Sequence, residues 1–234
     1  MGLLSERASG TELLDSADVD DALAWTSYRL MTGVNRWLGG VAVVRRFLDE
    51  QLALADGRPL RVLDIGSGAC DIPLALGRRR PGVHFTCLEP LPAAARIARA
   101  AIARAGVDNV ELREESVFDH RPAGPYGCAV ASLVLHHFDD VQIRRLVELL
   151  GSFVTGSFLV NDLHRTGLAL AGSAVLAAPF GMSVWHDTVL SVRRGFRRHE
   201  LASLLAGPGR AVSTGQLRWA GRVWAAVRFD GGKP

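Results

Sequence analysis

The stretch Val-Leu-Asp-Ile-Gly-Ser-Gly-Ala-Cys-Asp-Ile-Pro, residues 62–73, decides the fold of this chain of 234 residues. The largely apolar run from Leu60 to Ile65 predicts a strand that is buried on both faces, which is typical of parallel sheets. Gly66 and Gly68 allow the backbone to turn sharply and to approach a ligand, and Asp71 is suited to begin the following helix. A strand, a glycine turn and a helix in this order place a ligand at the carboxyl end of the strand.

The rest of the chain alternates between short apolar runs and helical patterns, which is typical of an α/β sheet. Helices are predicted at 72–80, 92–105, 141–150 and 198–206. No helix separates the last two strands, so they form an antiparallel hairpin at one edge of an otherwise parallel sheet. We therefore expect a Rossmann-like, doubly wound sheet of seven strands, at 60–65, 84–88, 110–113, 128–133, 153–160, 211–217 and 223–229.

Two further segments flank this pattern. Residues 1–55 contain two predicted helices, 20–32 and 41–55, joined by 33–40, and form an N-terminal helical cap within the same domain. Residues 56–234 form the main part of the domain. An insertion at about 163–196 is rich in apolar and small residues, and its position after the fifth strand predicts a helical lid over the carboxyl ends of the strands.

Composition excludes several classes of function. The length and the 48% hydrophobic content are those of one large α/β domain. The net charge of +3 comes almost wholly from arginines, and no aromatic residues interleave with their short clusters, so we expect a solvated surface rather than a nucleic-acid site.

The cysteines and the apolar segments bear on location. Cys70, Cys87 and Cys128 lie in or beside apolar runs without metal-site spacing, which indicates buried free thiols in a reducing, cytoplasmic compartment. The most apolar segment, 167–185, is interrupted by Pro179, and the N-terminus has no secretory pattern. We expect no membrane span.

The glycine turn favours a cationic ligand. A dinucleotide site needs a third glycine where this chain has Asp71, and a carboxylate there would repel a pyrophosphate. This substitution argues against a nicotinamide oxidoreductase. Asp64 adds a second carboxylate just before the turn.

The turn resembles the first motif of class I S-adenosylmethionine-dependent methyltransferases, hh(D/E)hGxGxG, with Cys70 in the variable last position. Glu89 ends the second strand, where the family places the acidic residue that holds the ribose hydroxyls. The resemblance implies S-adenosylmethionine as cofactor. It assigns the following cofactor residues: Asp64, Gly66, Gly68, Asp71, Glu89, Pro90, Ser116, Val117 and Ser132.

Two family positions differ here. Ser116 stands where relatives often place an acidic residue against the adenine, which leaves a serine hydroxyl and the N–H of Val117 for that contact. The loop after the fourth strand reads His136-His137-Phe138 and lacks the Asn/Asp-Pro-Pro-Tyr sequence of nucleobase-modifying relatives. This loop, the segment 35–40 and the lid are similar to those of UbiE-like, quinone- and phenol-modifying members.

Methylation of a phenol needs a base, and histidine has a suitable pKa near neutral pH. The candidate catalytic residues are His136, His137, His186 and Asp162. Apolar lid residues and the cap would line an acceptor site, for which the candidates are Tyr28, Asn35, Arg36, His164, Phe180 and Trp185. Catechol-type relatives hold a metal with an acidic residue where Ser132 stands, so we expect no metal.

The sequence thus predicts methyl transfer to an oxygen, or less favourably a carbon, of a small, largely apolar phenolic or quinone-like metabolite, of the kind made in secondary metabolism. The protein is expected to be a monomer or a homodimer. Two alternatives stay open: a cofactor-binding partner subunit without catalysis, whose lid is an interface, and a methyltransferase that acts on RNA or protein.

Overall fold

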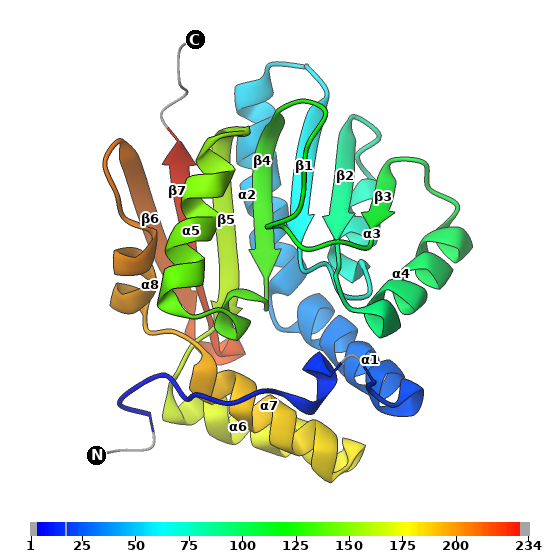
Figure 1. The fold of residues 1–234 in the computed structure, drawn as a ribbon, viewed down its shortest axis with the longest axis vertical. Helices are drawn as coiled ribbons and strands as arrows, with labels where there is room; N and C mark the ends of the chain where they lie inside the picture. The colour runs from blue at the N-terminus through cyan, green and yellow to red at the C-terminus, as the bar shows by residue number, and fades with distance from the viewer. Residues whose placement is uncertain (1–3, 17, 230–234) are drawn as a thin grey trace.

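The computed structural model describes residues 4–16 and 18–229. Its centre is one seven-stranded sheet with the strand order β3-β2-β1-β4-β5-β7-β6 (Figure 1). The first five strands are parallel, and β7 pairs antiparallel with both β5 and β6. The predicted doubly wound sheet with a C-terminal antiparallel hairpin is confirmed. The strands are β1 Leu60–Ile65, β2 Val83–Leu88, β3 Val110–Arg113, β4 Tyr126–Ser132, β5 Val154–Leu163, β6 Arg210–Leu217 and β7 Arg222–Phe229.

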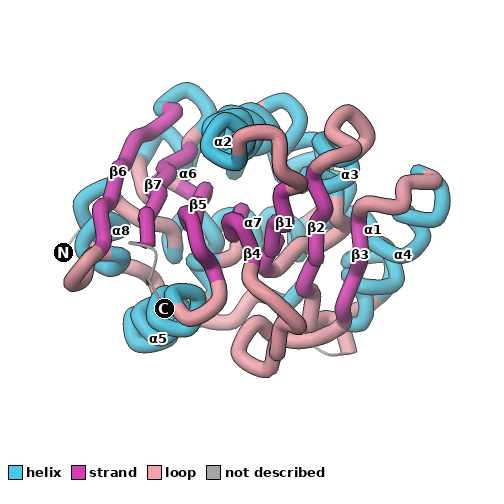
Figure 2. Tube along the Cα trace, turned by 90° about the horizontal axis from the view of Figure 1, so that it is seen from above, coloured by secondary structure: helices cyan, strands magenta, loops and turns pink. Residues whose placement is uncertain are grey.

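Helices cover both faces of the sheet (Figure 2). On one face lie α2 (Gly40–Ala55), α3 (Asp71–Gly77) and α4 (Pro92–Ala105), and on the other lie α5 (Asp140–Gly151) and α8 (Arg198–Leu205). In β1, Val62 packs into the core under α2, whereas Leu63 packs into the core under α5. Because successive side chains of a strand point to opposite faces, a strand covered on both sides is largely apolar, and in β1 only Arg61 and Asp64 are not.

The carboxyl ends of the parallel strands are covered by three further helices. These are α1 (Asp21–Trp37), α6 (Gly167–Ala177) and α7 (Met182–Arg194), which lie together below the strand tips in Figure 1. Helix α1 corresponds to the first predicted cap helix, and α6 and α7 correspond to the predicted lid. The second predicted cap helix, α2, packs instead on a face of the sheet. No helix in the described part of the chain is both long and apolar enough to cross a membrane.

Several predicted boundaries were wrong, among them the end of the helix predicted at 72–80, which stops at Gly77, and two of them bear on the site. The first cap helix does not stop at Gly33 but continues to Trp37, and the turn to α2 is made by Leu38 and by Gly39 at φ +82°. A helix tolerates one internal glycine at a cost of about 1 kcal/mol, so Gly33 was a poor stop signal. Strand β5 also runs three residues past the predicted end at Val160, which places Asp162 inside the strand.

The glycine turn is held by steric constraint. Gly66 has φ +62°, and a Cβ atom there would lie 2.3 Å from Cγ2 of Val134. Cys70, in the place of the third family glycine, also has a left-handed backbone, with φ 55°. The family pattern therefore reflects backbone conformations that glycine adopts most easily.

We predict that Gly66→Ala lowers the free energy of unfolding by about 1–3 kcal/mol more than Gly57→Ala does. Gly57 is a matched control because it has φ +79° and open space around its Cα. Both variants carry the left-handed strain, but only Gly66→Ala also overlaps Val134. Urea unfolding measures the difference, and equal losses for the two variants would contradict the account.

Candidate active site

A cavity of about 340 Å³ lies at the carboxyl ends of β1, β2 and β4, beneath α1 and α7. Its volume falls in the range of roughly 300–1,000 Å³ that is usual for small-molecule sites. Twelve of the predicted site residues line it: Tyr28, Asn35, Gly66, Gly68, Asp71, Glu89, Pro90, Ser116, Val117, Ser132, His136 and His137. The topology thus brings together residues that lie as far apart in the sequence as Tyr28 and His137.

Glu89 organises the glycine turn. Its Oε2 accepts a hydrogen bond from the N–H of Gly68 at 2.8 Å, and its Oε1 accepts one from the N–H of Leu91 at 2.9 Å. Burial raises the pKa of this carboxyl above its usual value. A carboxylate has about four acceptor positions, so two remain for a ligand in the cavity.

The turn holds two further buried carboxyls. Burial, together with the nearby charges of Asp71 and Glu89, raises the pKa of Asp64 to about 7, although Ser67 donates a hydrogen bond to it at 2.6 Å. Burial likewise raises the pKa of Asp71 to about 6. Three carboxyls that resist ionisation next to one another favour a cation in the adjoining space.

The loop after β4 places two imidazole rings in the cavity. Nδ1 of His136 lies 2.7 Å from Oδ1 of Asp162 on β5, and the His136 N–H donates to Oδ2 of the same carboxylate. Burial alone would raise the pKa of Asp162, but His136 and the hydrogen bonds hold it below its usual value. An ionised carboxylate can only accept, so Nδ1 of His136 carries hydrogen and Nε2 is directed away from Asp162.

His137 has a similar arrangement. Its Nδ1 lies 3.0 Å from Oδ2 of Asp15, and its ring lies 4.2 Å from that of His136, centroid to centroid. Burial opposes ionisation of Asp15, but the hydrogen bond from His137 lowers the pKa of this carboxyl. Both imidazoles therefore have a carboxylate partner at Nδ1.

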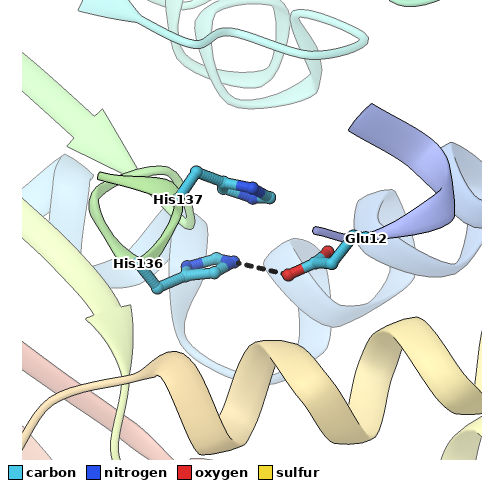
Figure 3. Close-up of side chains that lie close together, drawn as sticks. All are labelled: Glu12, His136 and His137. Carbon is cyan, nitrogen blue, oxygen red and sulfur yellow. Dashed lines mark ion pairs between the residues drawn. The ribbon is translucent and has the colours of Figure 1, made fainter. Parts of the chain in front are cut away.

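The N-terminal segment completes this part of the cavity. Glu12 is buried, with Oε1 3.7 Å from Nε2 of His136 (Figure 3). Burial raises the pKa of Glu12 to about 7. The segment is held in place by Asp187 of α7, whose two carboxylate oxygens accept from the N–H groups of Leu13 and Leu14.

Arg194 ties the same elements together. Its Nε donates to the carbonyl of His136 at 3.0 Å, and its NH1 lies 3.6 Å from Glu12. The sequence did not indicate Glu12, Asp15 or Arg194, because residues 1–19 carry no helical or strand period and Arg194 lies in a short surface-like arginine cluster.

A buried arginine closes the far side of the cavity. Arg222, at the start of β7, donates from NH2 to Oδ1 of Asn35 at 2.8 Å and from Nε to the carbonyl of Leu38 at 2.7 Å. Asn35 in turn donates to Asp71 at 3.3 Å. Burial lowers the pKa of Arg222 to about 10. These bonds join the cap to the edge hairpin and to the glycine turn.

Comparisons with known proteins agree with this geometry. Residues 63–152 match a family model described as a methyltransferase domain. A methyltransferase domain is therefore present at these residues. The predicted family and enzyme class are thereby confirmed, and the matched residues include the glycine turn, Glu89 and the His136-His137 loop.

Solved structures of low sequence identity share the fold of this methyltransferase. A candidate O-methyltransferase from Nostoc punctiforme PCC 73102 is 14% identical, with a TM-score of 0.67 over 97% of this chain and 65% of its own. The plantazolicin methyltransferase BpumL with SAH is 12% identical, with a TM-score of 0.64 over 93% and 97%. The magnesium protoporphyrin IX methyltransferase of Synechocystis PCC 6803 with SAH is 13% identical, with a TM-score of 0.59 over 82% and 84%. A search of curated protein sequences found no match.

Two predicted residues lie directly behind the cavity wall of the methyltransferase. Asp64 is hydrogen-bonded to Ser67, and Asp162 is hydrogen-bonded to His136; both of these partners line the cavity. Five others do not line the cavity: Arg36, His164, Phe180, Trp185 and His186. Arg36 is exposed on α1, and His164 lies at the start of the lid, where burial and nearby arginines lower its pKa.

The lid presents a different face from the one expected. On α7, Val184, Thr188 and Ser191 line the cavity, whereas Trp185 and His186 are exposed. Residues three and four apart share one helix face, and the sequence alone does not say which face of α7 turns inward. The lid residues named from hydrophobicity were therefore misplaced.

We predict that Asp162→Asn lowers the free energy of unfolding by about 1–3 kcal/mol. Oδ1 of Asp162 accepts from Nδ1 of His136 and from the N–H of Leu163, and Oδ2 accepts from the N–H of His136. An asparagine has one acceptor oxygen, so in either orientation its NH₂ faces a buried donor. Urea unfolding measures the loss, with Asp119→Asn as the control because Asp119 is exposed. Equal losses for the two variants would contradict this role of Asp162.

Proposed function

We propose that the protein transfers a methyl group from S-adenosylmethionine to an oxygen of a small, largely apolar acceptor with a phenolic or quinone-like body. One observation carries the proposal. The acidic glycine turn with Glu89 and the His136–Asp162 pair line the same cavity from adjacent strands. A cationic cofactor and a deprotonating group therefore meet in one space.

The residues of this chain suit S-adenosylmethionine. The two acceptor positions left on Glu89 match the two ribose hydroxyls. The buried carboxyls Asp64 and Asp71 favour a ligand that carries positive charge. The hydroxyl of Ser116 and the N–H of Val117 lie on the cavity wall for the adenine edge. Two of the structural relatives above contain SAH, the product that remains after methyl transfer.

The acceptor side of the cavity is formed by the cap and the lid. Its apolar wall would hold the body of the acceptor and leave one polar group to face the imidazoles. Those apolar side chains are Met31, Val34, Leu38, Leu176, Val184 and Val192. The names of the structural relatives give different acceptors, so the proposed class of acceptor is based on this apolar wall.

The cofactor and the His136–Asp162 pair together supply the methyl donor and the proton acceptor that the reaction needs. S-adenosylmethionine supplies an electrophilic methyl group on a sulfonium. The acceptor hydroxyl gives its proton to Nε2 of His136, and its oxygen forms the new bond to carbon as the carbon–sulfur electron pair stays on sulfur. Asp162 stabilises the imidazolium through Nδ1. Helices α1 and α7 exclude water and align the acceptor in line with the breaking bond.

We predict that Glu89→Gln weakens S-adenosylmethionine binding by about 10- to 100-fold, because charge-assisted hydrogen bonds contribute about 1.5–3 kcal/mol. Calorimetric titration of the purified protein measures the dissociation constant. Glu111→Gln is the matched control, since Glu111 is exposed on β3 and pairs only with Arg113. No binding to the wild type, or equal binding by both variants, would contradict the cofactor assignment.

Catalysis is tested with a panel of phenols and hydroxyquinones, by following SAH formation and the mass of the product. At least one panel member should gain a methyl group on oxygen, and His136→Gln should reduce kcat by about 100-fold or more. Cofactor binding without turnover of any member would contradict the proposed catalysis and favour the partner-subunit alternative. Turnover only with RNA or a protein would assign a macromolecular acceptor instead.

A further inference from the structure

We propose that Glu12, His136 and His137 bind a divalent first-row transition metal ion, such as Zn²⁺ or Fe²⁺, on the wall of the active-site cavity. One ligand atom from each of the three side chains lies within 4.8 Å of the others. All three residues line the cavity, and Figure 3 shows the two rings and the carboxylate facing one another. Two imidazoles and one carboxylate form a donor set that is typical of such ions.

The distances are close to those of a metal site. Oε1 of Glu12 and Nε2 of His136 are 3.7 Å apart, and tetrahedral bonds of about 2.1 Å place ligand atoms roughly 3.4 Å apart. The side chain of His137 is 24% exposed, so it is the least enclosed of the three ligands. Ligand-atom separations of up to 4.8 Å exceed the tetrahedral spacing by at most about 1.4 Å.

The surroundings of the rings support ligation more directly. In metal sites, a histidine ligand usually donates its second ring N–H to a carboxylate, which fixes the tautomer and the ring orientation. Here both rings have that partner: Asp162 lies at Nδ1 of His136, and Asp15 at Nδ1 of His137. In both of these adjacent histidines, Nε2 is thereby left available for another partner.

A buried carboxylate oxygen without a hydrogen-bond partner and the local excess of carboxylates also favour a bound cation. Oε1 of Glu12 is buried and has no hydrogen-bond partner among the described residues. Such an atom needs a partner, because burial of an unsatisfied carboxylate is costly. Three carboxyls lie beside the rings, at Glu12, Asp15 and Asp162, and Arg194 forms ion pairs with Glu12 and Asp15. A dication would compensate the excess negative charge.

Three protein ligands leave coordination positions open toward the cavity. For its chemistry this inference rests on the proposed function. With the ion bound, Nε2 of His136 is a ligand, so the acceptor hydroxyl would bind the ion and ionise there, releasing its proton to solvent. His136 accepts that proton itself only in the metal-free protein. The site differs from the catechol type, which uses an acidic residue at the position of Ser132.

Metal binding is tested on the full chain, independently of turnover. After removal of metal with a chelator, the wild type is titrated with Co²⁺, whose visible absorption reports nitrogen and oxygen ligation, and with Mg²⁺ for comparison. We expect one equivalent of Co²⁺ to bind, displaceable by Zn²⁺, and no competition from Mg²⁺. Glu12→Gln and His137→Gln should each weaken Co²⁺ binding at least 100-fold, and Asp15→Asn about 10-fold.

His84→Gln is the control, because His84 is an exposed histidine on β2 away from the cavity. Retained S-adenosylmethionine binding shows that each variant is folded. The proposal is overturned if the wild type binds no stoichiometric Co²⁺, or if Glu12→Gln and His137→Gln bind it as His84→Gln does. Failure of the wild type to bind S-adenosylmethionine both with and without metal would refute the proposed function instead, so the two failures are distinguishable.

Discussion

The fully buried carboxylate of Asp162 must find its hydrogen-bond donors inside the protein, and the arrangement of the cavity follows from where those donors lie. The donors are the backbone and ring of His136 and the N–H of Leu163. They fix the loop after β4 against the end of β5, and with it the direction in which Nε2 of His136 points. The geometry of the His136 imidazole is thus set by the sheet rather than by the lid.

The same loop then determines how the N-terminal segment closes the cavity. Arg194 bridges the carbonyl of His136 and the carboxylates of Glu12 and Asp15, while Asp187 holds the segment by its backbone. These contacts join residues at the start of the chain to the loop after β4 and to α7. Closure by polar contacts of this kind leaves the apolar side chains of α1 and α7 free to contact an acceptor.

The cofactor half of the site can be predicted from the sequence because its residues lie in short, contiguous motifs. The turn from Gly66 to Asp71 and the strand end at Glu89 are short motifs whose residue types are imposed by backbone conformation and charge. The acceptor half is not local. Asp15 meets His137 across 122 residues, and Arg222 enters the cavity from the edge hairpin. Nothing in a polar N-terminal segment, or in the sequence of α7, reveals which neighbour it will contact or which helix face turns inward.

A crystal structure of the protein with SAH bound is the most direct measurement. The account predicts that both ribose hydroxyls lie within hydrogen-bond distance of the Glu89 carboxylate. It also predicts that the sulfur faces the space bounded by His136, His137 and α7. A ribose held elsewhere, or a sulfur turned away from both imidazoles, would contradict the claim that cofactor and acceptor meet in this cavity.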